Sequence, residues 1–368
     1  MGVLSPKTGY DSLGLSCERG AKVAEVLLRG LNLPIEIVYG DTESSPEKGS
    51  LKAEKLINEG AHLLIGAQNS NVTAAIAQVC ERRGIPFLIN ISAASGITEQ
   101  GYRYVFRNYP TTEQLAKNGL SLMGELFKQA PVTPKTAALM YASTLYGQSL
   151  RESIMRLISN ANLPFKIIEE VAFNERTRDL SSEIAHIKAA KVDLLIPIVS
   201  INPATQMIRE CVKQHYCPMG IIGPGSTGMH EGLFCKSLGR HANYCMSNTP
   251  WHNSLSPLTQ KAMTVFKKKY PNDHFDLNIA FAIEAVLIAA DAFKRAGSTD
   301  GDRLRLALKE TYIANRIVYG GPISFDYKGQ AIGIDSVCVQ NHQGNPVVVL
   351  SVGHYESAPV FPMPAWST

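Results

Sequence analysis

Hydrophobic positions along the chain recur with two periods that alternate from the first residues onward. Short apolar runs have the length of buried strands, and the segments between them carry apolar side chains at helical spacing. This alternation is typical of βαβ units around a parallel sheet. After a first strand at Val3 and Leu4, it predicts helices at 13–28, 45–60 and 72–83, and strands at 35–39, 62–65 and 86–91.

The same alternation restarts after Pro110, which predicts a second unit of the same kind. Residues 256–311 then read as helical and residues 323–352 as short strands. The late helices need a sheet to pack on, and we expect them to return to the first unit. The pattern therefore predicts an α/β fold of two doubly wound parallel-sheet lobes joined by a three-strand hinge. Its crossings are expected near 108–113, 247–252 and 320–330, with lobe 1 at 1–110 and 250–325 and lobe 2 at 111–249 and 326–368.

Composition is consistent with two ordinary globular units and argues against a nucleic-acid partner and a membrane-spanning segment. The 368 residues include 36 basic and 32 acidic side chains spread along the chain, so no nucleic-acid partner is expected. The longest apolar stretch, 279–293, contains two acids and is too short to span a bilayer. The chain begins inside its first predicted strand, so we expect any export signal to be missing from this sequence.

Seven cysteines raise the question of metal or disulfide chemistry. Cys211, Cys217, Cys235 and Cys245 fall in a short stretch that also contains histidines, as in some zinc sites. No Cys-x2-Cys pair occurs, however, and Cys211 lies on the apolar stripe of a predicted helix. Buried or disulfide-bonded cysteines are therefore favoured over a metal site, and a Cys235–Cys245 disulfide is one alternative.

Motifs that carry catalysis are weak or missing. Residues 223–228 match G-x-G-x-x-G after a strand, but Pro224 interrupts the turn and no ribose-binding acid follows, which favours a loop lining a cleft. The sequence contains no G-x-S-x-G, H-E-x-x-H or Walker motif, and lone histidines such as His186 and His252 are more often structural. We expect neither an enzyme nor a cofactor, with a nucleotide-using α/β enzyme as an alternative.

Two polar turns follow neighbouring predicted strands and resemble an anion site. The first, 66–71, contains Asn69 and Ser70 before a helix, where free amides point beyond the end of the strand. The Ser70 hydroxyl either caps this helix or donates to a ligand carboxylate. The second turn, 92–96, should lie beside it, because ligands of open α/β sheets bind outside the carboxyl ends of the strands.

With these residues in view, the chain resembles the type I periplasmic binding proteins of the leucine/isoleucine/valine-binding family over nearly its whole length. The fragments that carry the resemblance occur in the family's order and spacing. They are 2–6 with Gly9 and Tyr10, Asp41 with Ser45 and Pro46, Gly66 with Ser70, 84–87, 92–95, 105–107, Tyr146 with Gly147, Asp193, Gly223 with Pro224, 292–300, and 321–326 with Gly329.

The resemblance implies non-covalent capture of a small solute between two closing lobes, as part of an ABC uptake transporter. It implies a periplasmic solute-binding protein, expected to be a monomer, that delivers its solute to a membrane permease with its ATPase subunits. In the family, the serine matching Ser70 and the turn matching 92–95 hold the ligand carboxylate, and aromatic residues matching Tyr10 and Tyr146 cover the ligand. The predicted ligand-binding residues are Tyr10, Asn69, Ser70, Ser92, Ala93, Ala94, Ser95, Tyr146, Ser200, Asn202 and Gly225.

The chain departs from the family's pattern at Gly225, where branched-chain amino acid binders place a glutamate that pairs with the ligand's ammonium. A buried ammonium without an anionic partner is unfavourable by several kcal/mol. The departure favours an organic or aromatic acid without an α-amino group. Branched-chain amino acid binding stays an alternative if Asp11 or Glu231 reaches the ligand, and a ligand-sensing regulatory protein on the same fold is another.

Overall fold

The computed structural model describes residues 1–8, 14–29, 34–351 and 355–366. The chain forms two compact units, one built from 1–111 and 250–335 and the other from 112–249 and 336–368. The chain thus passes from one unit to the other three times. The predicted α/β fold with parallel-sheet lobes is confirmed, and the late helices return to the first unit as expected.

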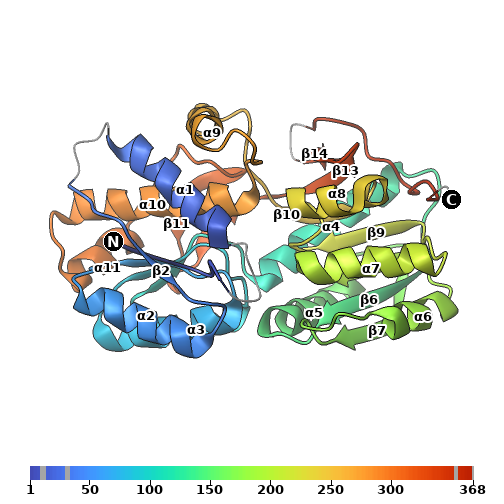
Figure 1. Ribbon diagram of the computed structural model, residues 1–368, viewed down its shortest axis with the longest axis horizontal. Helices are drawn as coiled ribbons and strands as arrows, with labels where there is room; N and C mark the ends of the chain where they lie inside the picture. The colour runs from blue at the N-terminus through green and yellow to red at the C-terminus, as the bar shows by residue number, and fades with distance from the viewer. Residues whose placement is uncertain (9–13, 30–33, 352–354, 367–368) are drawn as a thin grey trace. The chain divides into compact units, whose positions relative to one another are not determined.

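The first unit contains a five-stranded sheet in the order β2-β1-β3-β4-β5, in which all neighbouring strands are parallel. Helices α2 and α3 pack together on one face and α1 and α10 on the other (Figure 1). The elements are β1 (Gly2–Ser5), α1 (Gly14–Leu28), β2 (Val38–Asp41), α2 (Pro46–Asn58), β3 (Leu64–Gly66), α3 (Ser70–Arg83), β4 (Phe87–Ile89), η2 (Ser95–Ile97), β5 (Val105–Arg107), α9 (Pro257–Lys269), α10 (Leu277–Ala296), α11 (Gly301–Lys309), β11 (Gly320–Phe325) and β12 (Ala331–Ile334).

Side-chain caps define where the helices of this unit begin. Ser45 accepts from the amide of Lys48, directly before the proline that opens α2. Asp276 accepts from the amide of Ile279 at the start of α10, and burial raises the pKa of its carboxyl. Helix α3 ends at Gly84, whose φ of 63° is the left-handed conformation that glycine adopts readily. Most of these boundaries are local properties of the sequence.

A buried ion pair joins α10 to the segment before β11. The Arg316 Nη2 lies 3.0 Å from the Glu284 Oε2, and the two side chains are 5% and 1% exposed. Glu284 Oε1 also accepts from Arg316 Nε at 3.3 Å and from the amide of Ile317 at 3.1 Å. Such a pair fixes a geometry firmly, because losing either partner leaves an uncompensated buried charge.

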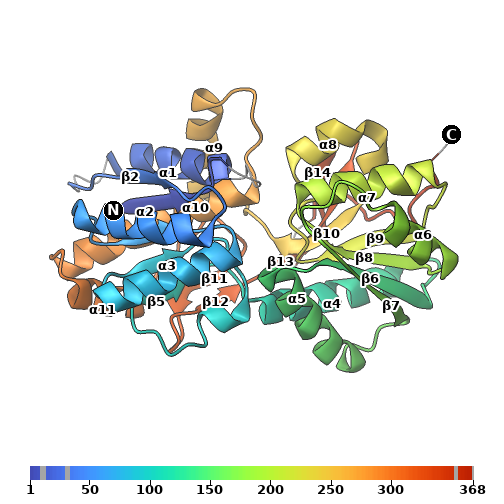
Figure 2. The ribbon, with the colours of Figure 1, turned by 60° about the horizontal axis from the view of Figure 1, so that its bottom comes forward.

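The second unit contains a seven-stranded sheet in the order β14-β13-β10-β9-β8-β6-β7, seen edge-on in the second view (Figure 2). Strands β6 to β10 pair in parallel, whereas β13 and β14 form an antiparallel hairpin. The elements are α4 (Thr112–Gln129), β6 (Thr136–Ala142), α5 (Leu145–Leu157), η3 (Ile158–Asn160), β7 (Lys166–Phe173), α6 (Ser181–Ala189), β8 (Leu194–Ile198), α7 (Ile201–Lys213), β9 (Gly220–Pro224), α8 (Gly232–Leu238), η4 (Gly239–Ala242), β10 (Met246–Pro250), β13 (Ser336–His342) and β14 (Asn345–Leu350).

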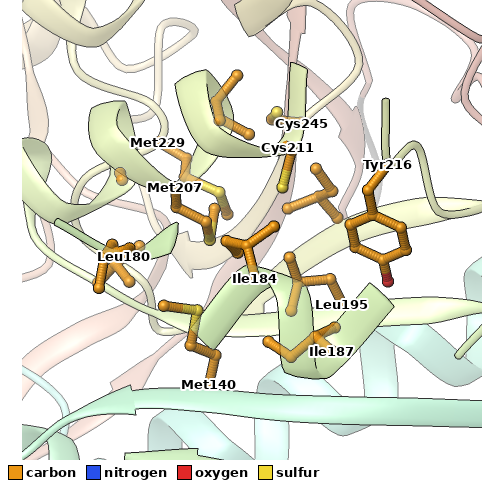
Figure 3. Packing of buried hydrophobic residues seen from close by; sticks show 14 of the residues in the cluster. Met140, Leu180, Ile184, Ile187, Leu195, Met207, Cys211, Tyr216, Met229 and Cys245 are labelled. Carbon is orange, nitrogen blue, oxygen red and sulfur yellow. The ribbon is translucent and has the colours of Figure 1, made fainter. Parts of the chain in front are cut away.

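The core of the second unit lies between this sheet and helices α6, α7 and α8. Figure 3 shows Met140 and Leu195 from the strands packed against Ile184 and Met207 from the helices. Cys211 and Cys245 are part of the same apolar cluster, and burial raises the pKa of both thiols. These cysteines behave as small hydrophobic residues.

Every cysteine that the structure describes is a free thiol, so the alternative of a Cys235–Cys245 disulfide is not realised. Of the four cysteines for which burial was favoured over metal binding, Cys211, Cys235 and Cys245 are buried, whereas Cys217 is partly exposed. Desolvation raises the pKa of Cys235 to about 11, which keeps this thiol protonated and unreactive at neutral pH.

Two boundaries differ from the sequence-based predictions. The third passage between units lies at 335–336 and not within 320–330, because β12 pairs with β11 and the Arg107 amide donates to Gly329 O at 2.8 Å. These contacts keep residues 326–335 in the first unit. Strand β2 lies later than the predicted 35–39, because Val38 to Asp41 pair with the whole length of β1.

Candidate functional site

In the first unit, two polar turns follow β3 and β4, which are neighbours in the sheet. The Ser92 hydroxyl, 1% exposed, lies 3.1 Å from Ala67 O and 3.0 Å from Gln68 O, and it also contacts the Thr73 hydroxyl. The two turns are therefore tied directly to each other. With its hydrogen bonds used in this way, Ser92 holds the edge in shape and has little capacity left for a ligand.

The Ser70 hydroxyl is not the cap of helix α3. Asn69 takes that position, with backbone angles of −81° and 128°, and its side-chain oxygen accepts from the amide of Asn71 at 3.0 Å. Ser70 is the first helical residue and is only 4% exposed. Its hydroxyl makes no hydrogen bond with any residue that the structure describes, so it is available to a ligand at the end of β3.

The turn after β4 is supported from behind by a buried arginine. Arg107, at the end of β5, donates from Nη1 to Ala94 O at 3.1 Å and from Nη2 to the Thr98 Oγ1 at 2.8 Å. Its side chain is fully buried, and desolvation lowers the pKa of its guanidinium to about 9. Ala93 and Ala94 are each 1% exposed. Arg107 is a positioning residue for this turn, and the sequence analysis did not identify it.

Polar atoms without partners gather at the carboxyl ends of the strands in this unit. They are buried, and none has a hydrogen-bond partner among the described residues. The four atoms are the Ser5 Oγ in the last residue of β1, the Thr42 Oγ1 after β2, the Asn90 Oδ1 after β4 and the Asn108 Oδ1 after β5. Unpaired buried polar groups are uncommon and need a reason such as a ligand or water. Their distribution makes this edge the candidate for a polar binding surface.

In the second unit, the predicted residues also lie at the carboxyl ends of strands. The Tyr146 hydroxyl, at the start of α5 after β6, donates to Gly225 O in the loop after β9. Ser200, before α7, donates to the Glu175 Oε1 at 3.1 Å. Asn202 is exposed in the first turn of α7. The structure brings Tyr146 and Gly225 together, while Ser200 is joined to Glu175.

Gly225 leaves little room for a side chain, and its backbone conformation disfavours one. Its φ is 73°, and an added Cβ would lie 3.0 Å from Leu150 Cδ2 and 3.1 Å from the Tyr146 Oη. The neighbouring Ser226 contacts Val199 N and Val199 O, at 3.3 and 3.1 Å, which ties the loop to the end of β8. Helix α8 begins only at Gly232, so the glycine-rich segment does not open directly into a helix as a dinucleotide loop does.

The same loop ends in a buried acid and a buried histidine. Glu231 is 4% exposed, and its Oε1 lies 3.9 Å from the Nε2 of His230, which is 2% exposed. Burial lowers the pKa of His230 to about 4, so the imidazole is neutral at physiological pH. Glu231, the acid noted as an alternative partner for a ligand ammonium, thus lies in the same loop as Gly225. Its side chain is enclosed beside His230.

Two residues expected near the ligand, Tyr10 and Asp11, fall outside the described residues. Within 1–8, 14–29, 34–351 and 355–366, no group of three His, Cys, Asp or Glu side chains is placed to hold a metal ion. In the same part of the chain, every helix is too short or too polar to cross a bilayer.

Comparison with known proteins gives matches over most of the chain. The family model described as "Periplasmic binding protein" matches residues 1–335. A leucine-, isoleucine-, valine-, threonine- and alanine-binding protein of Pseudomonas aeruginosa is 21% identical over 84% of this chain and 79% of its own. The Leu/Ile/Val-binding protein homologue 1 of Brucella abortus is 26% identical over 89% of this chain and 86% of its own.

Solved structures share the fold. The leucine-binding protein LivK of Thermotoga maritima superposes with a TM-score of 0.82 at 21% identity, covering 97% of both chains. A solute-binding protein of an ABC transporter from R. palustris, in complex with benzoate, superposes with a TM-score of 0.82 at 19% identity, covering 100% of this chain and 97% of its own. At these identities the likeness concerns the fold.

Proposed function

We propose that this chain, which belongs to the periplasmic binding protein family, captures a small solute with a carboxylate and no α-ammonium for an ABC uptake transporter. The family consists of substrate-binding proteins that work with a membrane permease and ATPase subunits. An extracytoplasmic location follows from the same proposal. We further propose that binding draws the two units together, which small-angle scattering would detect as a smaller radius of gyration.

The observation that carries the proposal is the free hydroxyl of Ser70 at the start of α3. A helix begins with amides that lack intrahelical partners and carry partial positive charge, and these favour an anion. Ser70 adds a hydroxyl donor beside them, because Asn69 has already taken the cap position. The adjoining turn is held against this one by Ser92, which gives a carboxylate a rigid surface of donors.

The loop after β9 argues against an ammonium. Gly225 offers no carboxylate, and its positive φ and the close Tyr146 hydroxyl disfavour any side chain at this position. Glu231 lies further along this loop, where it is enclosed beside His230. Structural neighbours are divided, since one is complexed with benzoate and another with isoleucine. The absence of an acid at Gly225 supports our proposal of a solute without an ammonium.

A thermal-shift panel of four compounds tests the proposal. Benzoate and benzamide differ in the negative charge, whereas 4-methyl-2-oxopentanoate and leucine differ at the α-position in carrying a keto group or an ammonium. A ligand at about one hundred times its Kd stabilises the folded protein by about 2.7 kcal/mol, which raises Tm measurably. We expect at least one of the two acids without ammonium to raise Tm, with no effect of benzamide or leucine.

Micromolar binding of leucine would overturn the choice of solute class and return the chain to the amino acid binders. In that case Glu231 becomes the candidate partner for the ammonium, and Glu231→Gln should abolish leucine binding. A panel in which no acid binds, extended to other aromatic and short organic acids, would contradict the carboxylate proposal itself.

A further inference from the structure

We propose that a groove on the first unit is a second binding site, separate from the solute site, for a small anion with two or more negative charges. The groove has a volume of about 320 Å³, which is within the range of small-molecule sites. Its walls are residues 98–106, the second half of α11 and the turn between β11 and β12. In the second view these elements lie on one side of the unit (Figure 2).

Cations predominate in the wall of the groove. Arg103, Arg305, Lys309 and Lys328 line it, against two carboxylates, those of Glu99 and Asp326. These cations come from all three segments, so they surround the space and do not form a single stripe along one helix. An anion inside would contact positive charge from several directions, which favours more than one negative group on the ligand.

The two carboxylates of the groove are already engaged. The Glu99 Oε2 lies 2.6 Å from the Lys328 Nζ. The Asp326 Oδ1 accepts from the amides of Lys328 at 2.8 Å and of Gln330 at 2.9 Å, and so it fixes the turn between β11 and β12. Glu99 thus neutralises Lys328, and the positive charge that remains is on Arg103, Arg305 and Lys309.

These three cations have a single acid between them. The Asp302 Oδ1 lies 3.5 Å from the Arg103 Nη2 and 3.1 Å from the Arg305 Nε, and it also accepts from the Tyr104 hydroxyl at 2.9 Å. Lys309 makes no ion pair with any residue that the structure describes. With Asp302 counted, four cations face three carboxylates, and the unbalanced charge lies at the α11 side of the groove.

The Arg305 guanidinium is held in position before any ligand arrives. Both Arg103 and Arg305 lie 5.7 Å from the centre of the Tyr104 ring, but the Arg305 side chain is only 17% exposed and that of Arg103 is 63% exposed. The backbone at Arg103 is fixed by Glu81, which accepts its amide at 3.0 Å. The preorganised Arg305 loses little entropy on binding, and both guanidiniums suit carboxylate or phosphate oxygens.

Aromatic side chains complete the wall of the groove. Tyr102, Phe106 and Tyr327 line it together with the cations, which adds apolar surface beside the charges. The groove therefore fits a multivalent anion whose charges are carried on a compact or planar group, such as an aromatic polycarboxylate or a condensed phosphate. None of the predicted solute-binding residues that the structure describes lines it.

Isothermal titration of the full chain with inorganic pyrophosphate and with benzene-1,3,5-tricarboxylate tests the site. The test variant Arg305→Gln/Lys309→Gln removes two cations of the groove, and Lys309→Gln alone removes an exposed one whose loss should change stability little. The matched control, Lys267→Gln/Lys269→Gln, removes the same charge from exposed positions at the end of α9. Melting curves check that all variants are folded.

We expect at least one probe to bind the wild-type protein. The groove double variant should weaken it at least about tenfold, and Lys309→Gln alone severalfold. The control should leave the affinity unchanged, as should Ser70→Ala, which alters only the proposed solute site. No binding of either probe up to about 10 mM, an equal loss in the control, or a loss in Ser70→Ala would overturn the proposal.

Discussion

Replacing Ser70 by alanine separates solute binding from folding in this protein. The hydroxyl is enclosed, has no partner among the described residues and lies at the first position of α3, while Asn69 provides the cap. A hydroxyl in that position contributes to function only through a ligand. We therefore expect Ser70→Ala to weaken binding and to leave the stability of the free protein almost unchanged.

The magnitudes follow from the contacts. A hydrogen bond to a charged group contributes about 1.5–3 kcal/mol, so a carboxylate that loses the Ser70 donor should bind about ten- to a hundredfold more weakly. Alanine is favourable inside a helix, and the substitution should change the free energy of unfolding by less than about 0.5 kcal/mol. Asn69→Ala removes a real cap and should lower stability by about 1 kcal/mol, or a few degrees in Tm.

The assay combines calorimetric titration with melting curves for both variants. The titrant is the acid that raises Tm most in the four-compound panel. Thr264→Ala serves as a binding control, because this exposed residue of α9 bonds only to a carbonyl within its own helix, Gln260 O at 2.8 Å. Its Kd should equal that of the wild-type protein.

Two results would refute the reasoning. An unchanged Kd in Ser70→Ala would show that the hydroxyl does not contact the solute. A fall in Tm for Ser70→Ala as large as that for Asn69→Ala would show that Ser70 supports the helix start after all.

Three further predictions concern stability. Gly225→Ala should lower the free energy of unfolding by about 1–2 kcal/mol, because its φ of 73° disfavours a side chain, and an unchanged urea midpoint would contradict this. Arg316→Met should cost about 3–5 kcal/mol by leaving the Glu284 carboxylate buried without its partner, and adding Glu284→Gln should restore part of the loss in denaturant titrations. Burial lowers the pKa of His252 to about 4. Between pH 6.5 and 4 the unfolded chain therefore binds a proton at this residue, while the folded protein does not. Stability should fall as pH decreases through this window, by up to about 1.4 kcal/mol per pH unit, and the fall should be less steep in His252→Gln.

The sequence by itself determined the architecture. Alternating strand and helix periods, Pro46 after Ser45 and the glycine at the end of α3 are local signals, and each acts on neighbours a few residues away. Such signals predict parallel sheets in two units without knowledge of tertiary contacts. Because parallel strands share one carboxyl edge, the sequence also indicated that the turns after β3 and β4 would be adjacent.

Only the tertiary structure decided how polar atoms at that edge are used. Ser92 and Ser70 look equivalent in the sequence, yet Ser92 is bonded to the backbone of the preceding turn and Ser70 is left free. Arg107 reads as an ordinary basic residue until β5 places its guanidinium behind Ala94. The hydrogen bonds of these side chains depend on which backbone atoms the folded chain brings next to them from distant parts of the sequence.

The same dependence explains the features that sequence reasoning missed or misplaced. The β11–β12 hairpin stays with the first unit because Gly329 meets the backbone of β5, far away in the sequence. The groove beside it unites cations from three separated segments, and none of these segments is notably basic on its own. Hydrophobic periodicity is encoded over a few residues, whereas a hydrogen-bond partner or a charged groove exists only once the chain has folded.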